Sequence, residues 1–307
     1  MSKVLVTGSN GYIGSVLVPE LKKLHEVNCI DLGVFDGKYT GDVRNPKEEW
    51  FDGVDAVIHL AGISTDPTSQ AYPRLTDLTN HIGTEKIATM AYKKGIKKFI
   101  FASTCSIYFN LETSENPPEY TKSDLVSPIS CYSLTKRFAE ECLLEMADDN
   151  FKPIIFRMGT IYGHSPRMRY DLVLNSFVKD SFLKRKMLVD SEGLVWRPII
   201  DIQDVIKSYV NALDSQESGI FNLLNENITI GYLAQQVKEI LKEINVDVSI
   251  DYLPYRKTRN YKASSFLPRT RSLEEAILEM WDKLEKSKIN PEDNIYYNDR
   301  WYREYLK

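Results

Sequence analysis

Residues 3–14 read KVLVTGSNGYIG, and this stretch decides the fold of the chain. The apolar run at its start predicts a buried strand, and a turn containing Gly8, Gly11 and Gly14 follows directly. The residues after the turn carry apolar side chains at helical spacing, which predicts a helix. A strand, a glycine turn and a helix in this order predict a dinucleotide-binding turn. Its glycines allow a tight turn, close approach of the backbone to a pyrophosphate, and close helix–strand packing.

The cofactor expected on this turn is NAD. The N-terminus of the predicted helix supplies unpaired N–H groups and a partial positive charge for the phosphates. Asp31 closes the next predicted strand, where an acidic residue accepts hydrogen bonds from the adenosine ribose. A carboxylate there repels the 2'-phosphate of NADP, and residues 32–34 contain no arginine to bind one. We predict that the turn contacts NAD through Gly8, Asn10, Gly11, Tyr12, Ile13 and Gly14.

Strands and helices alternate through the N-terminal half. Short apolar runs predict further strands at residues 27–31, 54–60, 98–102 and 153–157, and helical periodicity predicts helices at residues 12–24, 78–94 and 133–147. Apolar strands alternating with helices predict a parallel sheet covered on both faces. The predicted fold class is therefore α/β, with a Rossmann-type doubly wound parallel sheet.

The regular alternation of strands and helices ends after Gly163, and the segments that follow are mixed. We predict helices at residues 170–184, 203–213 and 232–244, a strand at 198–200, and a charged helical tail from residue 273. This pattern predicts an NAD-binding Rossmann domain over residues 1–163, with core elements added by about 198–222. Residues 164–307 mainly form a smaller mixed substrate-binding lobe.

Composition excludes several classes of protein. The formal net charge of −4 shows no basic excess of the kind that marks proteins that bind nucleic acid or membrane surfaces. No apolar stretch approaches the roughly 20 residues that span a bilayer. The four cysteines lack paired spacing, which indicates reduced thiols, and the first residues enter a strand without a signal peptide. We expect a cytoplasmic protein without a metal site, and no nucleic-acid or membrane partner.

Residues 132–136 read YSLTK and place Tyr132 and Lys136 four apart at the start of a predicted helix, so that both project to one side. A phenol with a pKa near 10 is a poor base at neutral pH. A neighbouring ammonium stabilises the phenolate, and lowering the pKa to near 7 corresponds to roughly 4 kcal/mol. We assign this effect to Lys136 together with an oxidised nicotinamide, and predict that Tyr132 and Lys136 are catalytic.

Together with further motifs, these residues make the chain resemble the extended short-chain dehydrogenase/reductase family, whose members mostly modify nucleotide-activated sugars. The resemblance runs from residue 3 to about residue 263. It rests on residues 7–14 (TGSNGYIG), 41–43 (GDV), 59–62 (HLAG), 80–84 (NHIGT), 102–104 (AST), 132–136 (YSLTK), 157–163 (RMGTIYG), 196–204 (WRPIIDIQD) and 221–222 (FN).

The resemblance implies roles in binding the cofactor and in catalysis. Tyr132 would act as general base or acid at a sugar hydroxyl or ketone, Lys136 would bind the nicotinamide ribose, and Thr104 would hold the reacting oxygen. The remaining implied cofactor contacts are Asp42 and Val43 at the adenine, Leu60, Ala61 and Gly62 along the dinucleotide, and Asn80 and Ser103.

The resemblance also implies a nucleotide-diphosphate sugar as substrate. Asn175 and Arg197 would bind its diphosphate, since arginine suits bidentate contacts, and Arg259 is a candidate second contact. The alternatives are an ordinary polar helix residue and surface arginines. Arg167 and Arg169 either add positive charge near the diphosphate or lie in a solvated loop.

A homodimer is implied as well, through the helices predicted at residues 78–94 and 133–147. The apolar content of these helices equally fits burial within a monomer.

Departures from the family pattern narrow the reaction. Nucleotide-sugar 4,6-dehydratases carry an Asp-Glu pair directly after the threonine, where this chain has Cys105 and Ser106, and neither protonates a hydroxide leaving group at neutral pH. Relatives that decarboxylate uronates also require a Glu near there. GDP-fucose synthase-like enzymes use a Cys and a His, at positions that here hold Ser106 and Asn175. Dehydration, decarboxylation and the Cys/His epimerisation of GDP-fucose synthase-like enzymes are therefore not expected.

Hydride transfer at C4 of the sugar remains, with Tyr132 as acid/base. Return of the hydride to the opposite face would make the enzyme a 4-epimerase. Release of the ketone or alcohol would make it a nucleotide-sugar 4-dehydrogenase or 4-ketoreductase. A third hypothesis, a non-catalytic NAD-sensing regulator, is disfavoured because a sensor needs neither Tyr132 nor Lys136.

Overall fold

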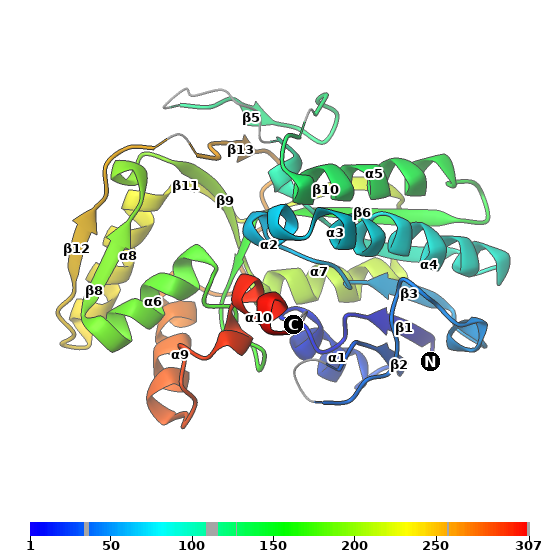
Figure 1. Ribbon diagram of the computed structural model, residues 1–307, viewed down its shortest axis with the longest axis horizontal. Helices are drawn as coiled ribbons and strands as arrows, with labels where there is room; N and C mark the ends of the chain where they lie inside the picture. The colour runs from blue at the N-terminus through cyan, green and yellow to red at the C-terminus, as the bar shows by residue number, and fades with distance from the viewer. Residues whose placement is uncertain (34–36, 109–115, 127, 257, 306–307) are drawn as a thin grey trace.

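A six-stranded sheet forms the centre of one half of the molecule (Figure 1). The computed structural model describes residues 1–33, 37–108, 116–126, 128–256 and 258–305. All paired strands of this sheet are parallel. Their spatial order is β10 (Gly219–Leu223), β6 (Lys152–Met158), β4 (Lys98–Thr104), β3 (Ala56–His59), β1 (Lys3–Thr7) and β2 (Glu26–Ile30).

Helices cover both faces of this sheet (Figure 1). One face carries α3 (Pro73–Asn80), α4 (Ile82–Lys93) and α5 (Cys131–Glu145), and the other carries α1 (Gly14–Leu21) and α7 (Ile202–Asp214). Buried side chains on both sides bring helices and strands into two apolar clusters. This arrangement confirms the predicted α/β fold with a Rossmann-type sheet. The helix predicted at residues 78–94 is two helices that meet at His81, and a further short helix, α2 (Asp66–Ala71), precedes them.

Smaller elements build the rest of the chain. Three short sheets pair β11 (Glu226–Thr229) with β9 (Trp196–Asp201) and β7 (Thr160–Tyr162), β12 (Ser249–Tyr252) with β8 (Lys186–Val189), and β13 (Lys262–Ala263) with β5 (Glu119–Tyr120). The longer helices here are α6 (Val173–Lys184), α8 (Ile230–Glu243) and α9 (Leu273–Lys286). Short 3-10 turns occur at η1 (Glu48–Phe51), η2 (Cys105–Tyr108), η3 (Ser191–Gly193) and η4 (Asn294–Tyr296).

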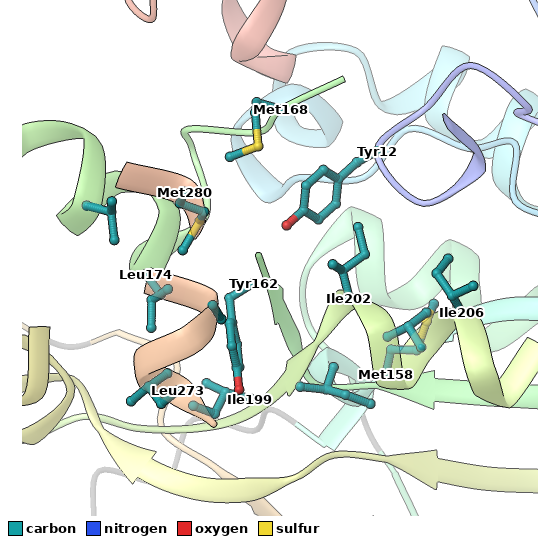
Figure 2. Packing of buried hydrophobic residues seen from close by; sticks show 14 of the residues in the cluster. Tyr12, Met158, Tyr162, Met168, Leu174, Ile199, Ile202, Ile206, Leu273 and Met280 are labelled. Atoms are coloured by element: carbon teal, nitrogen blue, oxygen red, sulfur yellow. The ribbon is translucent and has the colours of Figure 1, made fainter. Parts of the chain in front are cut away.

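One apolar cluster joins the two halves. Figure 2 shows Tyr12 from the glycine turn near Ile202 of α7 and Met168, with Leu174 of α6 and Met280 of α9 beyond them. All of these side chains are buried. Because interiors pack at the density of organic crystals, this shared core fixes the second half firmly against the glycine turn.

The strand order places a crevice between the halves. The chain leaves β1 toward β2 on one side and leaves β3 toward β4 on the other, so the connections diverge between the neighbouring strands β1 and β3. In open α/β sheets, ligands bind outside the carboxyl ends of the strands at such a switch point. The segment that ends in α10 (Asn298–Tyr305) lies across this region and contacts α2 (Figure 1). Within the described residues, no helix combines the length and apolar character needed to cross a membrane.

Candidate active site

The glycine turn leaves no room for a side chain at Gly8 or at Gly14. Gly8 has a φ of +70°, and a Cβ there would lie 2.6 Å from the backbone nitrogen of Ala61. A Cβ on Gly14 would lie 2.4 Å from the carbonyl oxygen of Gly8. The turn is therefore pressed against the end of β3, and its backbone faces the crevice without side chains in between. This geometry fits the pyrophosphate of a dinucleotide.

Two carboxylates lie beside the turn. Asp31 follows β2, and its Oδ2 accepts a hydrogen bond of 3.0 Å from the backbone N–H of Asn10. Asp42 is bound by Arg44, whose Nε donates to Oδ1 at 2.9 Å. Burial raises the pKa of Asp42, but the hydrogen bonds from Arg44 outweigh burial and hold that pKa below its ordinary value. Asp31 thus ties the adenosine end of the crevice to the glycine turn.

A cavity of about 740 Å³ extends from this turn into the second half, which is large among ligand sites. It brings together most of the residues predicted from the sequence. Those lining it are Gly8, Gly11, Tyr12, Ile13, Gly14, Asp31, Asp42, Val43, Leu60, Ala61, Gly62, Ser103, Thr104, Tyr132, Lys136, Arg197 and Arg259.

Three predicted residues do not line the cavity, and their contacts explain why. Asn10 supplies only its backbone N–H, to Asp31. The buried Asn80 accepts from the Ile63 N–H at 2.7 Å and donates to the Ile63 carbonyl at 2.9 Å. Asn175 accepts from the Gly163 N–H and donates to the Tyr12 hydroxyl at 3.0 Å. These amides bind other parts of the chain, and the predicted contacts of Asn80 with the cofactor and of Asn175 with the substrate diphosphate stay predictions.

Helix α5 and strand β4 place the catalytic candidates. Ser130 caps the helix by accepting a hydrogen bond from the Ser133 N–H. Lys136 Nζ donates to the Ala102 carbonyl at 2.8 Å. The Thr104 side chain acts as a hydrogen-bonding neighbour of the Tyr132 phenol, and both side chains line the cavity. The Ala102 carbonyl and the Thr104 side chain of β4 therefore face Lys136 and Tyr132, which lie one helical turn apart on α5.

Burial governs the protonation of this pair. It raises the pKa of Tyr132 to about 12, although the Thr104 hydrogen bond and the charges of Arg169 and Arg259 lower it. It lowers the pKa of Lys136 to about 8, partly offset by Glu140. The predicted acidification of Tyr132 depends on Lys136 together with an oxidised nicotinamide, and it stays a prediction. At neutral pH the phenol is protonated and the ammonium is mostly charged.

A buried network supports the end of β4. Glu140 follows Lys136 by one turn of α5, and its carboxylate accepts from Ser103 Oγ at 2.5 Å and from Arg157 Nη2 at 2.6 Å. Arg157 Nη1 also donates to the Tyr108 hydroxyl at 2.9 Å. Charge-assisted hydrogen bonds of this kind are strong. The network fixes the strand that carries Thr104 against the helix that carries Tyr132.

The two positions after Thr104 differ in accessibility. Cys105 is fully buried, and its Sγ donates to the Arg157 carbonyl at 3.1 Å, while burial raises the pKa of the thiol. Ser106 lines the cavity and accepts a hydrogen bond of 3.3 Å from Arg259 Nη1. A neutral hydroxyl therefore occupies the cavity position that follows Cys105.

Arginines line the part of the cavity that the second half provides. Arg197 donates to the carbonyls of Trp196 and Arg259. Arg167 and Arg169 do not lie in a solvated loop: Arg167 is 6% exposed, and Arg169 pairs with Asp171 at 2.8 Å. The site can therefore present concentrated positive charge to an anionic ligand.

A sequence profile of the NAD dependent epimerase/dehydratase family matches residues 4–223, which is more than half of the chain. The chain belongs to this family. It is therefore an enzyme of the extended short-chain dehydrogenase/reductase type, and its cofactor is NAD. The glycine turn, Asp31 and the ends of β1 and β3 fit that cofactor, as described above.

Members of the family with different activities are similar to this chain. UDP-glucuronic acid decarboxylase 1 from Danio rerio is 27% identical over 260 residues, which cover 78% of this chain but only 60% of the decarboxylase. The uncharacterized UDP-glucose epimerase YtcB from Bacillus subtilis (strain 168) is 27% identical over 255 residues, or 75% of this chain and 76% of YtcB. The dTDP-D-glucose 4,6-dehydratase from Mus musculus is 24% identical and covers 98% of this chain and 88% of its own length.

Solved structures of the family share the fold. The UDP-N-acetylglucosamine 4-epimerase from Methanobrevibacter ruminantium M1, in complex with UDP-N-acetylmuramic acid, superposes with a TM-score of 0.78 at 24% identity, covering 92% of this chain and 99% of the epimerase. MoeE5, in complex with UDP-glucuronic acid and NAD, gives a TM-score of 0.78 at 20% identity, over 92% and 99% of the two chains.

The cavity also contains residues that the sequence analysis of this epimerase/dehydratase family member missed. Asp66, at the start of α2, lies in the cavity wall, and so do Asn298, Trp301 and Tyr302 of α10. Asn298 donates to Ser64 Oγ at 3.0 Å and its Oδ1 accepts from Arg167 at 2.6 Å. In the described parts of the chain, no group of three or more His, Cys, Asp or Glu side chains is arranged to hold a metal ion.

Proposed function

We propose that this enzyme is a nucleotide-sugar epimerase that acts by hydride transfer at C4 of the sugar. The observation that carries the proposal is the pairing of the Tyr132 and Thr104 hydroxyls in the cavity wall, with Lys136 one helical turn away. The neutral Cys105 and Ser106 support epimerisation over elimination of water, because neither protonates a departing hydroxide.

The chain's own residues perform the proton chemistry. Tyr132 first releases its own proton to solvent, because a neutral phenol cannot accept one. The phenolate then takes the proton of the 4-hydroxyl and later returns it, and Thr104 orients the reacting oxygen by hydrogen bonding. Lys136 keeps positive charge beside the phenol, which favours the phenolate while the proton is away. Bound NAD supplies the acceptor and donor of the hydride, and its oxidised ring adds the positive charge that a phenol with a raised pKa requires. Epimerisation further requires the 4-keto sugar to turn its opposite face toward the hydride donor before the hydride and the proton return.

The diphosphate of the substrate would lie against the arginines of the second half. Arg197 and Arg259 line the cavity near Ser106, and guanidinium groups bind phosphate oxygens in a bidentate manner. We expect Arg197→Lys to raise KM for every nucleotide sugar while kcat changes little. An unchanged KM would remove Arg197 from the binding site.

The test of the reaction is incubation of the NAD-loaded enzyme with UDP-glucose and with UDP-N-acetylglucosamine. Epimerisation predicts the 4-epimer in the product mixture by NMR, without net change in NADH absorbance. Accumulation of NADH with a keto product would instead indicate a 4-dehydrogenase, and consumption of added NADH a 4-ketoreductase. Tight NAD binding without turnover of any nucleotide sugar would indicate a regulator, and each of these outcomes overturns the epimerase proposal.

We also propose a homodimer through α4 and α5. Their outward surface exposes Tyr92 (44%) and Phe138 (42%), which supports an apolar contact. Light scattering on the purified enzyme should give twice the mass of one chain. Phe138→Asp should shift it toward a single chain, whereas a wild-type monomer contradicts the proposal.

A further inference from the structure

The carboxylate of Asp66 is placed beside the catalytic pair by two short helices. Asp66 is the first residue of α2, after the capping residue Thr65. Further along α2, Ser69 Oγ accepts a hydrogen bond of 3.1 Å from the backbone N–H of Tyr132 at the start of α5. The beginnings of α2 and α5 are thereby tied together, and Asp66 faces the same cavity as Tyr132.

The two oxygens of Asp66 differ in their partners. Oδ2 pairs with Arg259 Nη1 at 2.9 Å, and the side chain is 15% exposed. Oδ1 is buried, and among the residues that the structure describes no donor reaches it. A buried carboxylate oxygen without a donor is unfavourable, and such a group in a native structure calls for a partner. Since Asp66 lines the cavity, a bound ligand can supply that donor.

Asp66 also lies within electrostatic range of the reacting position. Its charge is one of the influences that raise the pKa of Tyr132, while the charge of Arg259 acts in the opposite direction. Because α2 is tied to the start of α5 and Asp66 lines the same cavity as Tyr132, we expect a sugar that holds its 4-hydroxyl against Tyr132 to bring its neighbouring substituents toward Asp66. Carbon 6 is two bonds from carbon 4, so a carboxylate there would share this space.

We propose that Asp66 determines sugar specificity: it accepts a hydrogen bond from a hydroxyl or ammonium group of the sugar and disfavours sugars that carry a carboxylate. This inference rests on the proposed function, in which C4 is bound at Tyr132. Arg259 offsets part of this effect, but its Nη1 is engaged by Asp66 and Ser106.

The test measures equilibrium binding of UDP-glucose and UDP-glucuronic acid to the NAD-loaded full chain by calorimetry. These ligands differ only at carbon 6. The wild type should bind UDP-glucose at least about tenfold more tightly, because like charges placed together are unfavourable. Asp66→Asn, which is nearly isosteric, should reduce this preference about tenfold. Asp66→Glu keeps the charge and should keep the preference.

Asp190→Asn is the matched control. Asp190 also lines the cavity but pairs with Arg256 at its rim, so the same loss of charge occurs away from Tyr132. This variant should leave the ratio of the two affinities unchanged. Melting curves of all variants establish that they are folded before affinities are compared.

The outcomes separate this inference from the proposed function. Equal wild-type affinities, or an unchanged ratio in Asp66→Asn, overturn the role of Asp66 even if UDP-glucose is epimerised. Discrimination that depends on Asp66, without turnover of either sugar, supports the role of Asp66 while the epimerase proposal fails.

Discussion

The cavity has two walls that are built in different ways. The cofactor wall consists of segments that directly follow β1, β2 and β3, and it is formed largely by backbone and small side chains. The substrate wall joins side chains from distant segments, as in the pairing of Asp66 with Arg259 and of Arg167 with Asn298. Backbone contacts recognise what all members of the family share. Side chains from distant segments can change without disturbing the sheet.

The largest effect should come from Tyr132→Phe, which removes one hydroxyl where the two walls meet. We expect kcat to fall by about 10²- to 10⁴-fold, as for loss of a general acid or base. Affinities for NAD and for UDP-glucose should stay within about threefold, because a single neutral hydrogen bond contributes little net energy. Single-turnover kinetics and calorimetry measure both quantities. Loss of ligand affinity together with turnover would show that the Tyr132 hydroxyl is needed for binding rather than for proton transfer.

The next largest effect should come from Gly8→Ala in the cofactor wall. Its Cβ would lie 2.6 Å from the Ala61 nitrogen, and overpacking of this kind weakens binding of NAD by about 10- to 100-fold. Gly95→Ala is the matched control, since Gly95 has a φ of +71° but no atom within 4 Å of the added Cβ. The control should lose stability and keep its affinity for NAD. Equal losses of NAD affinity in both variants would contradict the close-approach explanation.

The pH dependence of turnover tests the role of Lys136. Burial lowers the pKa of Lys136 to about 8, so its positive charge is lost as the pH rises through this value. With NAD bound, its oxidised ring favours the Tyr132 phenolate already near neutral pH, so we expect kcat/KM to be level there and then to fall about tenfold for each pH unit above 8. Lys136→Arg keeps its charge in this range, so any remaining activity should lack that decline. A wild-type profile level to pH 10 would contradict the assignment.

The smallest effect should come from Asn298→Ala in the substrate wall. This change removes hydrogen bonds to Ser64 and from Arg167. We expect affinity for the nucleotide sugar to fall by about 2- to 10-fold, the range of one or two net hydrogen bonds. Asn290→Ala, which alters an exposed asparagine, serves as the control. If Asn298→Ala weakened NAD binding more than sugar binding, α10 would belong to the cofactor wall.

The same contrast explains how far the sequence predicts the molecule. Apolar runs and the glycine turn determine the sheet and the cofactor wall, because both depend on neighbours along the chain. The sequence could not show the hydrogen bonds of Asn80 and Asn175, since their partners Ile63 and Gly163 lie in loops that only the fold brings close to them. The helix predicted at residues 78–94 failed to show the break at His81 for a similar reason, because tertiary packing overrides local propensity.

Asp66 escaped sequence analysis because a single carboxylate carries no pattern. Its significance comes from Arg259 and Tyr132, which lie far away along the chain and meet it only in the fold. The opposing effect of burial on the pKa of Tyr132 could not be predicted, because spacing shows that Lys136 is near but does not show how deeply the phenol is buried.

The position of α10 has a consequence for synthesis on the ribosome. Gly8 emerges early, whereas Asn298, which bridges Ser64 and Arg167, is added roughly 290 residues later, about 15 to 60 seconds at ordinary translation rates. Until β10 has been made, β6 is an unprotected edge of the nascent sheet, open to pairing with other chains. The growing polypeptide therefore passes through a period in which its cofactor turn exists but its cavity is incomplete, and chaperones have the most to protect during that interval.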